Sequence, residues 1–303
     1  YLEPDQRDAL AKLAVSRLIT DQAALWNIYR GWFPSRAPCT AADLEARTPD
    51  GTCNDPNVPM MGAANTRFTR QTFPYGPGAQ QDTANLMNPN PRTVSRKLFT
   101  RRRFEGLPFL NLLGAAWIQF MIHDWFNHTN SRQDFWEIPL SRRDPLARGR
   151  TSMRVAKTLE DPTRQPFEQG LAPTFLNETT HWWDASQVYG SDAATAARLR
   201  EGSGGRLRVD ANGRVPVGPR GFDDTGLSVN WWMGLGLMHD LFLKEHNAIA
   251  AMLAQAYPNW TDQQLYDKAR LINSALLARI HTVEWTPAIL PNSSLDVGMN
   301  TNW

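Results

Sequence analysis

Long hydrophobic runs, an excess of one charge and cysteine are all scarce in this chain of 303 residues. The longest apolar stretch, 107–122, covers about 16 residues and is interrupted by Asn111 and Gln119, whereas a helix needs about 20 apolar residues to cross a bilayer. We therefore expect no transmembrane helix. The 32 Lys and Arg residues nearly balance the 30 Asp and Glu residues, which leaves a net charge of +2. Because the one dense basic run, Arg101 to Arg103, is short, we expect no nucleic-acid partner.

The chain has only two cysteines, Cys39 and Cys53, and a turn-rich segment separates them. One local disulfide in an exported protein and two free thiols in a cytosolic protein both fit this count. The first residue is Tyr1 rather than Met, which indicates a processed or trimmed chain from which an export signal could have been lost. A disulfide would favour a secreted or periplasmic protein, but the sequence leaves the compartment open.

Helical periodicity is frequent in the sequence, and strand-like alternation is rare. The apolar spacing predicts helices over 4–32, 107–126, 233–257 and 261–285. Pro258 separates the last two helices, and Asp262 lies in the first turn of the second. We find no internal repeat and predict a mainly α fold.

The rest of the sequence predicts long loops. Residues 33–100 are rich in Pro, Gly and Asn, and polar loops are expected after the second helix as far as about Leu171. One small β-hairpin is expected over 206–217, where Asn212 and Gly213 form the turn. The twelve tryptophans suit either a wall around a flat apolar cofactor or simply an aromatic-rich core.

The predicted helix over 107–126 carries an informative group of polar residues. Gln119 and His123 lie one turn apart on one face of the helix, and Asp124 points about 100° away from His123. On a helix that is otherwise apolar nearly all round, such residues form either a structural hydrogen-bond node or part of a functional site.

A second group follows in the segment THWWDASQVYG, residues 180–190. Thr180, Trp182, Asp184 and Ser186 occupy alternate positions, so an extended loop would turn two hydroxyls, one carboxylate and one carbonyl to the same side. Calcium takes six to eight oxygen ligands of this kind, and Asp124 is the candidate for a further carboxylate. The alternative is that these residues simply line a turn.

Three motifs, QFMIHD (119–124), THWWDASQVYG (180–190) and MHDLFLKEHNAI (238–249), occur in this order. Together they resemble the animal-type haem peroxidase and cyclooxygenase superfamily, in particular its fatty-acid alpha-dioxygenase branch and related bacterial haem peroxidases. The resemblance runs from about Cys53 to the end of the chain. It implies the helical haem-peroxidase fold, with 1–303 as the N-terminal portion of a single domain.

The resemblance also implies roles for individual residues. His123 would be the distal histidine above haem b, with Gln119 as its companion over the haem face. Asp124 would be a calcium ligand together with Thr180, the carbonyl of Trp182, Asp184 and Ser186. A neutral imidazole above haem can take a proton from peroxide and return it to the leaving oxygen, while a nearby amide orients the oxygen species.

The segment RIHTVEWT, residues 279–286, resembles the alpha-dioxygenase motif in which a histidine and a threonine hold the fatty-acid carboxylate. His281 and Thr286 would take these roles, because a cationic imidazole and a hydroxyl can together bind a carboxylate. The alternative is that both are ordinary residues of a helix and its end.

The chain departs from the mammalian peroxidases of this superfamily in two respects. Ile122 stands where those enzymes have a carboxylate that forms an ester with haem, and neither Asn230 nor Trp231 can form the second ester. The region of their catalytic arginine, 226–229, contains no arginine. Both differences favour noncovalently bound haem and the dioxygenase branch.

The family's proximal histidine and the tyrosine whose radical takes the substrate hydrogen lie beyond the segment that resembles 279–286. His128, His181, His239 and His246 are present, but none occupies the proximal position of the family. We therefore expect an incomplete catalytic unit, whose proximal histidine comes from a downstream segment or from a second polypeptide.

The resemblance predicts a haem-dependent oxidoreductase that adds O2 to the alpha carbon of a fatty acid and gives a 2-hydroperoxy acid. The first alternative is a peroxidase that uses H2O2 to oxidise small reductants. The second is a noncatalytic subunit that calcium stabilises. The amphipathic pattern over 4–32 would also allow contact with a membrane surface. Acyl length and oligomeric state are not specified by the sequence.

Overall fold

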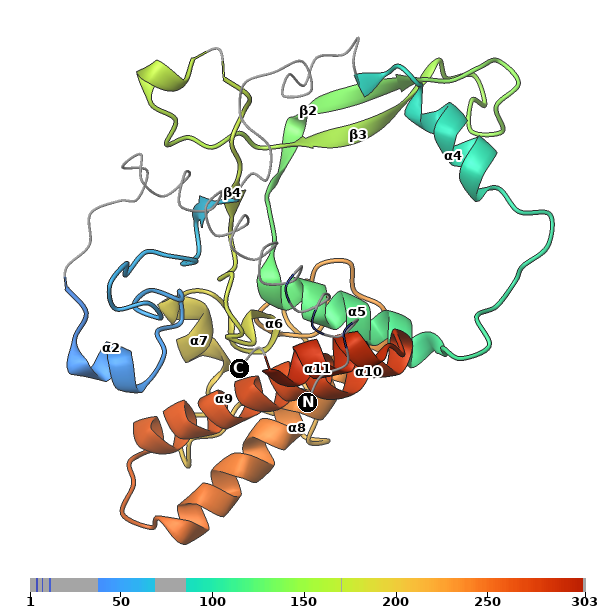
Figure 1. The fold of residues 1–303 in the computed structure, drawn as a ribbon. Coiled ribbons are helices and arrows are strands. Elements are labelled where there is room, and N and C mark those ends of the chain that lie inside the picture. The colour runs from blue at the N-terminus through green and yellow to red at the C-terminus, as the bar shows by residue number, and fades with distance from the viewer. Residues whose placement is uncertain are drawn as a thin grey trace. The chain divides into compact units, whose positions relative to one another are not determined.

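The computed structural model describes residues 38–68, 86–169 and 171–301, together with Pro4, Arg7 and Ala11. Most of the helix predicted over 4–32 lies outside these residues. Figure 1 shows that helices account for most of the regular structure, which confirms the mainly α prediction. The helices are α2 (Ala41–Glu45), α4 (Pro91–Phe99), α5 (Leu112–Trp125), α6 (Ser186–Tyr189), α7 (Ala193–Leu199), α8 (Met233–Ala256), α9 (Asp262–Arg279), α10 (Thr286–Ile289) and α11 (Ser293–Thr301), with a 3-10 turn at Pro166–Glu168 and a π-helix at Ile280–Trp285.

The strands form two small sheets. β1 (Thr66–Arg67) pairs with β4 (Leu176–Asn177), and β2 (Asn130–Pro139) pairs with β3 (Ser152–Thr158). The contacts within the chain divide it into two compact units. The first contains 1–66, 111–127 and 177–303, and the second contains 67–110 and 128–176. The expectation of a single domain over 1–303 stays a prediction.

The second unit contains the main β-hairpin, in a region where the sequence predicted polar loops. β2 and β3 are antiparallel, with Phe135 opposite Ala156 and Pro139 opposite Ser152. The loop prediction was wrong because most β2 side chains are exposed or half-buried, so the strand lacks the clear alternation that marks a buried face.

The same unit contains α4, within the region 33–100 that was predicted to be loop. Asn90 caps this helix by accepting hydrogen bonds from the backbone N–H groups of Arg92 and Thr93, and Pro91 occupies the first helical position. Asn followed by Pro is a start signal for a helix, and the loop prediction over 33–100 left it out of account.

Three of the predicted helices of the first unit, those over 107–126, 233–257 and 261–285, are confirmed as α5, α8 and α9, and their ends have local causes. α5 begins at Leu112 rather than at 107 because Asn111 accepts a hydrogen bond from the Leu113 N–H, 2.9 Å away. α8 ends before Pro258. Thr261 and Gln264 form a capping box at the start of α9. The helix over 261–285 keeps α geometry only to Arg279 and continues as the π-helix.

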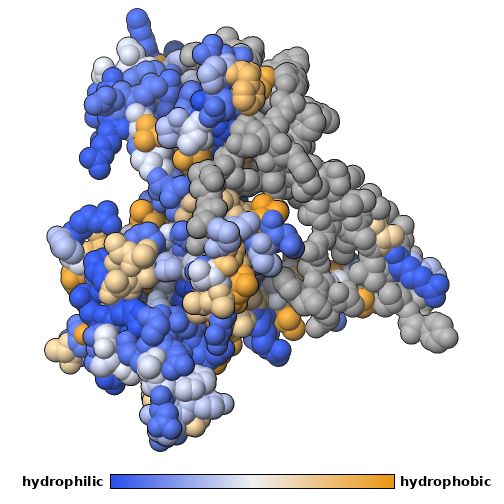
Figure 2. Space-filling model, turned by 90° about the vertical axis from the view of Figure 1, so that its left-hand side faces the viewer, coloured by the Kyte–Doolittle hydropathy of each residue, from blue (hydrophilic) through white to orange (hydrophobic). Residues whose placement is uncertain are grey.

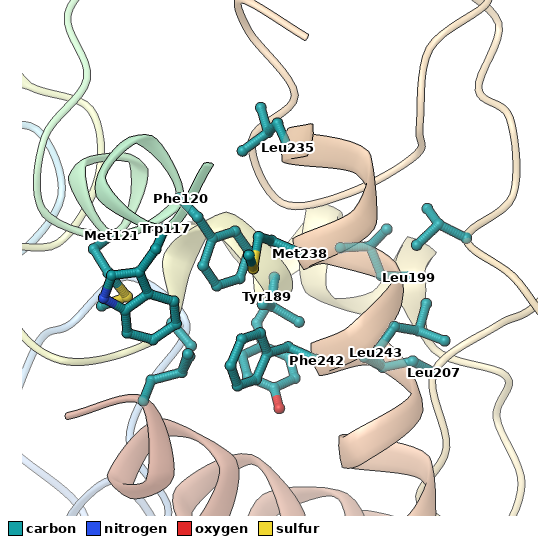
Figure 3. Close-up of a cluster of buried hydrophobic side chains, with 14 of the residues drawn as sticks. Trp117, Phe120, Met121, Tyr189, Leu199, Leu207, Leu235, Met238, Phe242 and Leu243 are labelled. Carbon is teal, nitrogen blue, oxygen red and sulfur yellow. The ribbon is translucent and has the colours of Figure 1, made fainter. Parts of the chain in front are cut away.

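The core of this unit lies where α5, α6 and α8 meet. Figure 3 shows Trp117 and Phe120 of α5 close to Phe242 of α8, with ring centroids 5.9 and 5.3 Å from the Phe242 ring. Tyr189 of α6 belongs to the same buried cluster. This apolar packing holds α5 against α8. On the face of the molecule drawn in Figure 2, by contrast, hydrophobic residues are scattered among hydrophilic ones.

The hairpin predicted over 206–217 is not formed as two paired strands. The turn exists, since Gly213 has a φ of +70° and the Asp210 N–H donates to the Arg214 carbonyl at 2.8 Å. However, Arg208 bonds to Leu199 and Gly218 bonds to Phe222, so the two arms pair with other segments. Tertiary contacts override the local turn signal here.

Cys39 and Cys53 form a disulfide, with their Cα atoms 5.8 Å apart. The two cysteines are therefore paired rather than free, as one of the two alternatives expected. None of the helices within the described residues is long and apolar enough to cross a membrane.

Candidate functional site

α5 carries Gln119 and His123 on one face, as its sequence predicts. Gln119 is half-buried, and its amide bonds to two groups that precede α8: its Nε2 donates to the Asn230 carbonyl at 3.0 Å, and its Oε1 accepts from the Trp232 indole at 2.7 Å. His123 is buried, and its Nδ1 has no hydrogen-bond partner among the described residues. The Gln119 amide is therefore fixed in orientation, whereas His123 retains a nitrogen available to a ligand.

A second buried histidine, His239 of α8, lies close to His123. Its ring meets the Phe120 ring edge-on, with centroids 5.1 Å apart. Burial and, to a smaller extent, nearby His123 lower the pKa of His239 to about 3, against the opposing effect of the Leu227 backbone. Burial also lowers the pKa of His123. Both imidazoles are therefore neutral at neutral pH, which is the form in which a histidine can accept a proton.

Several buried polar atoms around α5, α6 and α8 lack a hydrogen-bond partner in the described structure. They include His123 Nδ1, both ring nitrogens of His239, and both amide atoms of Gln187, which is fully buried. An unsatisfied buried polar group costs about 1–3 kcal/mol, and native proteins contain few of them. This group of residues therefore fits a site that receives a further polar group or a cofactor.

Four of the five expected calcium ligands gather around one point of the first unit. Asp124, Thr180, Asp184 and Ser186 are all almost completely buried. The Asp124 Oδ1 accepts from the Ser186 N–H at 2.6 Å, and the hydroxyls of Thr180 and Ser186 lie 3.3 Å apart. Ala185 adopts a left-handed φ of +54°, which is rare for a residue with a side chain and turns the chain into α6 at this point.

The electrostatics of this cluster suit a cation. The Asp124 Oδ2 has no hydrogen-bond partner in the part of the chain that is described. Burial raises the pKa of Asp124 well above its usual value, and the nearby Asp184 carboxylate raises it further, although the Ser186 backbone opposes the shift. Two buried carboxylates beside two hydroxyls fit the hard-oxygen chemistry of calcium. No contact of the Trp182 carbonyl identifies it as a ligand; its indole donates to the Met61 carbonyl at 2.8 Å.

Three further residues, which belong to none of the predicted sites, also lie at the cluster. Arg47 donates to Asp184 at 2.9 Å, and Asn54 donates to the same carboxylate at 3.0 Å. A Cβ on Gly51 would lie 2.7 Å from the Thr180 side chain, so only glycine fits there. No local pattern marked these three residues, because they lie far from Asp184 in the sequence.

His281 and Thr286 lie on and immediately after the π-helix. The Thr286 hydroxyl donates to the His281 carbonyl at 2.7 Å. The His281 Nδ1 is buried and, within the described residues, has no hydrogen-bond partner, and burial lowers the pKa of the imidazole. The two residues are therefore close together, but the Thr286 hydroxyl would have to turn before it could donate to a carboxylate. π-Helical turns are rare and occur frequently at functional sites.

His246 already has partners for both of its ring nitrogens. Its Nδ1 lies 2.9 Å from the Tyr189 hydroxyl, and its Nε2 lies 2.9 Å from the Gly205 carbonyl. His128 is exposed and belongs to the second unit. Neither arrangement is that of an iron ligand.

Comparisons with known proteins agree on one family. The family model described as animal haem peroxidase matches residues 46–302. The chain is 35% identical to "Alpha-dioxygenase 2" of Arabidopsis thaliana over 85% of this chain and 39% of that protein. It is 35% identical to "Alpha-dioxygenase PIOX" of Nicotiana tabacum over 97% of this chain and 44% of that protein.

Solved structures agree with the sequence matches. The fatty acid alpha-dioxygenase of Arabidopsis thaliana superposes with a TM-score of 0.77 at 28% identity, covering 100% of this chain and 51% of that one. The chain thus spans about half the length of the relatives it matches. Because the family model covers most of its residues, the chain belongs to the animal haem peroxidase family.

Proposed function

We propose that this chain supplies the distal side of a haem-dependent oxygenase that adds O2 to the alpha carbon of fatty acids. The observation that carries the proposal is His281, a half-buried imidazole on a π-helix whose buried Nδ1 has no hydrogen-bond partner within the described residues and whose ring contacts the Trp117 ring on the same helix as His123. The named activity of the alpha-dioxygenase relatives supports the same reaction.

Haem, when bound, would supply the oxidising chemistry of this reaction. His123 is the residue that would hold a proton on the distal side, because its imidazole is neutral and its Nδ1 is unpaired. Gln119 would orient the oxygen species, since two hydrogen bonds hold its amide in place. Ile122, Asn230 and Trp231 offer no carboxylate, which supports noncovalent binding of haem b.

The substrate proposal assigns the fatty-acid carboxylate to His281 and Thr286. A protonated imidazole forms a strong charge-assisted hydrogen bond with a carboxylate, and a hydroxyl can add a second bond. Asp124, Thr180, Trp182, Asp184 and Ser186 would bind calcium and tie α5 to the segment before α6. The iron ligand of the opposite side would come from a residue outside 1–303, on the same or a second polypeptide.

Oxygen uptake by the full haem-containing protein tests this function. We expect uptake on addition of palmitate, with the 2-hydroperoxy acid identified by mass spectrometry. His123→Leu should lower the rate at least about 100-fold, because a proton-transfer group contributes 10²–10⁴-fold. His128→Leu is the matched control and should retain the wild-type rate, since His128 is exposed and lies in the second unit.

Other outcomes would identify the alternatives. Peroxide-dependent oxidation of small phenols without oxygen uptake on fatty acids would indicate a peroxidase. The match to "Peroxidase mlt-7" of Caenorhabditis elegans, at 28% identity, and the occupied Thr286 hydroxyl favour this second candidate. No haem absorption in material that contains every partner polypeptide would instead indicate the noncatalytic subunit.

A further inference from the structure

Three tryptophans from two separate segments surround the imidazole of His281. Trp117 stacks on it, with ring centroids 6.2 Å apart and an angle of 29° between the planes. Trp125 meets it at 87° with centroids 5.1 Å apart, and Trp183 meets it at 56° with centroids 5.6 Å apart. Trp125 and Trp183 also contact each other edge-on at 5.1 Å. We call these three residues the tryptophan cage.

The cage leaves His281 without a polar partner. Its Nδ1 is buried and, among the described residues, has no hydrogen-bond partner. The elements packed against it carry His123 and Asp124 on α5, and His181 and Asp184 before α6. Its own helical segment carries Arg279 and Glu284, which are exposed and lie 3.7 Å from each other. Burial is the one cause of the lowered pKa of His281.

An imidazole in such a cage responds strongly to the charge of its ligand. Without a ligand, burial keeps the ring neutral. An anionic ligand supplies the counter-charge for a protonated ring. The three indoles, whose centroids lie 5.1 to 6.2 Å from that of the imidazole, would then add cation–π stabilisation of about 0.5–2 kcal/mol. A neutral ligand of the same chain length would obtain neither contribution.

We propose that Trp117, Trp125 and Trp183 are specificity-determining residues that make the His281 site select ligands with an anionic carboxylate over uncharged ligands. The inference rests on the proposed function, because it takes His281 as the residue that meets the fatty-acid carboxylate. It assigns to the cage a part in substrate choice, in addition to its part in the core.

Calorimetric binding of decanoate and 1-decanol to the full haem-containing protein, without oxygen or peroxide, tests the cage. Titrations at pH 7.5 in two buffers of different ionisation enthalpy give both Kd and the protons taken up on binding. We expect decanoate to bind at least about 10-fold tighter than decanol, with uptake of most of one proton. His281→Gln should abolish both the preference and the proton uptake.

Trp183→Leu is the informative cage variant, because Trp183 is only half-buried. Its preference for decanoate should fall about 3-fold while Kd for decanol changes little, and Trp183→Phe should lie between it and wild type. Trp260→Leu is the matched control, since Trp260 stacks on Tyr257 with centroids 4.1 Å apart, outside the cage.

Equal weakening of both ligands with unchanged proton uptake in Trp183→Leu would overturn the proposal and leave the cage as apolar packing. Failure of wild type to bind decanoate would overturn it too. Oxygen uptake on palmitate distinguishes a failure of the cage proposal from a failure of the proposed function. If wild type oxygenates palmitate but the cage variants still prefer decanoate to decanol, the proposed function stands and the cage proposal is wrong. Absence of oxygen uptake, with selective decanoate binding retained, would count against the proposed reaction alone.

Discussion

His246 is a fully buried histidine in a hydrogen-bonded network of the first unit. The Tyr189 hydroxyl lies 2.9 Å from its Nδ1 and accepts a hydrogen bond from Asn273 at 2.8 Å. The His246 Nε2 lies 2.9 Å from the Gly205 carbonyl and donates to it, so the Tyr189 hydroxyl donates to Nδ1. Burial lowers the pKa of His246 from 6.5 to about 4, so the network requires a neutral imidazole.

This requirement makes stability depend on pH. Because the folded pKa lies below the unfolded value, the unfolded chain binds more protons between pH 6.5 and about 4, and stability falls as pH is lowered through that window. The contribution is complete above pH 6.5 and its loss is at most about 3 kcal/mol. The lowered pKa of His239 likewise makes stability fall as the pH is lowered.

Urea unfolding between pH 7 and 5 measures the effect. His246→Asn should be less stable at pH 7 by about 1–3 kcal/mol, because partners lose their bonds, yet should show a shallower pH dependence than wild type. His128→Asn, at an exposed position, should keep the wild-type slope. A slope for His246→Asn as steep as that of wild type would contradict the assignment.

At the scale of elements, Gly226 sets how closely the segment before α8 packs on α6. A Cβ at Gly226 would lie 2.1 Å from the Ser186 carbonyl oxygen and 2.3 Å from the Gly190 nitrogen. Both are backbone atoms that cannot turn away. The Leu227 N–H also donates to the Gln187 carbonyl at 3.1 Å. The contact therefore needs a residue without a side chain.

Gly226→Ala should lower the free energy of unfolding by about 3 kcal/mol, because a core contact is overpacked. Gly218→Ala is the matched control, since its Cβ would lie 3.4 Å from the nearest atom, and it should change the free energy by less than about 1 kcal/mol. Urea unfolding at neutral pH compares the two. Equal free energies of unfolding for the two variants would contradict this expectation, because α6 would then be able to shift without loss of stability.

At the scale of the whole molecule, calcium would join distant segments of the first unit. Asp124 belongs to α5, while Thr180, Asp184 and Ser186 lie more than fifty residues later. Asp124 accepts from the Ser186 N–H and keeps an unpaired Oδ2 in a buried setting. A bound ion would neutralise the Asp124 carboxylate, whereas Asp184 already pairs with Arg47, and it would stabilise the folded state according to its concentration and affinity.

Chelation of calcium with EGTA should therefore lower the thermal midpoint of wild type, by an amount equivalent to about 2–3 kcal/mol at saturating ion. Asp124→Asn should lose this response and, in EGTA, should be at least as stable as wild type, because it removes a buried charge. Thermal unfolding followed by tryptophan fluorescence measures both.

Asp161→Asn serves as the control for a buried carboxylate in the second unit. Asp161 pairs with Arg67 and accepts a hydrogen bond from Thr174, so its loss should lower stability while leaving the calcium response intact. A calcium response that persists in Asp124→Asn would place the ion elsewhere.

The sequence by itself determined the main helices, because their signals are local. The apolar period of α5, α8 and α9 and the cap at Thr261 act within a few residues, so they predict a helix without knowledge of the fold. The order of the three motifs likewise indicated the family before any contact was known. β2 and α4 were missed where the local signal was weak or was not used.

Only the tertiary structure decided which side chains meet. Arg47 and Asn54 reach Asp184 from 137 and 130 positions away, and the tryptophan cage combines α5 with the segment before α6 around His281. The Thr286 hydroxyl bonds to a backbone carbonyl rather than standing free. Such contacts depend on how separate elements pack against one another, and packing between distant segments leaves no periodic mark in the sequence.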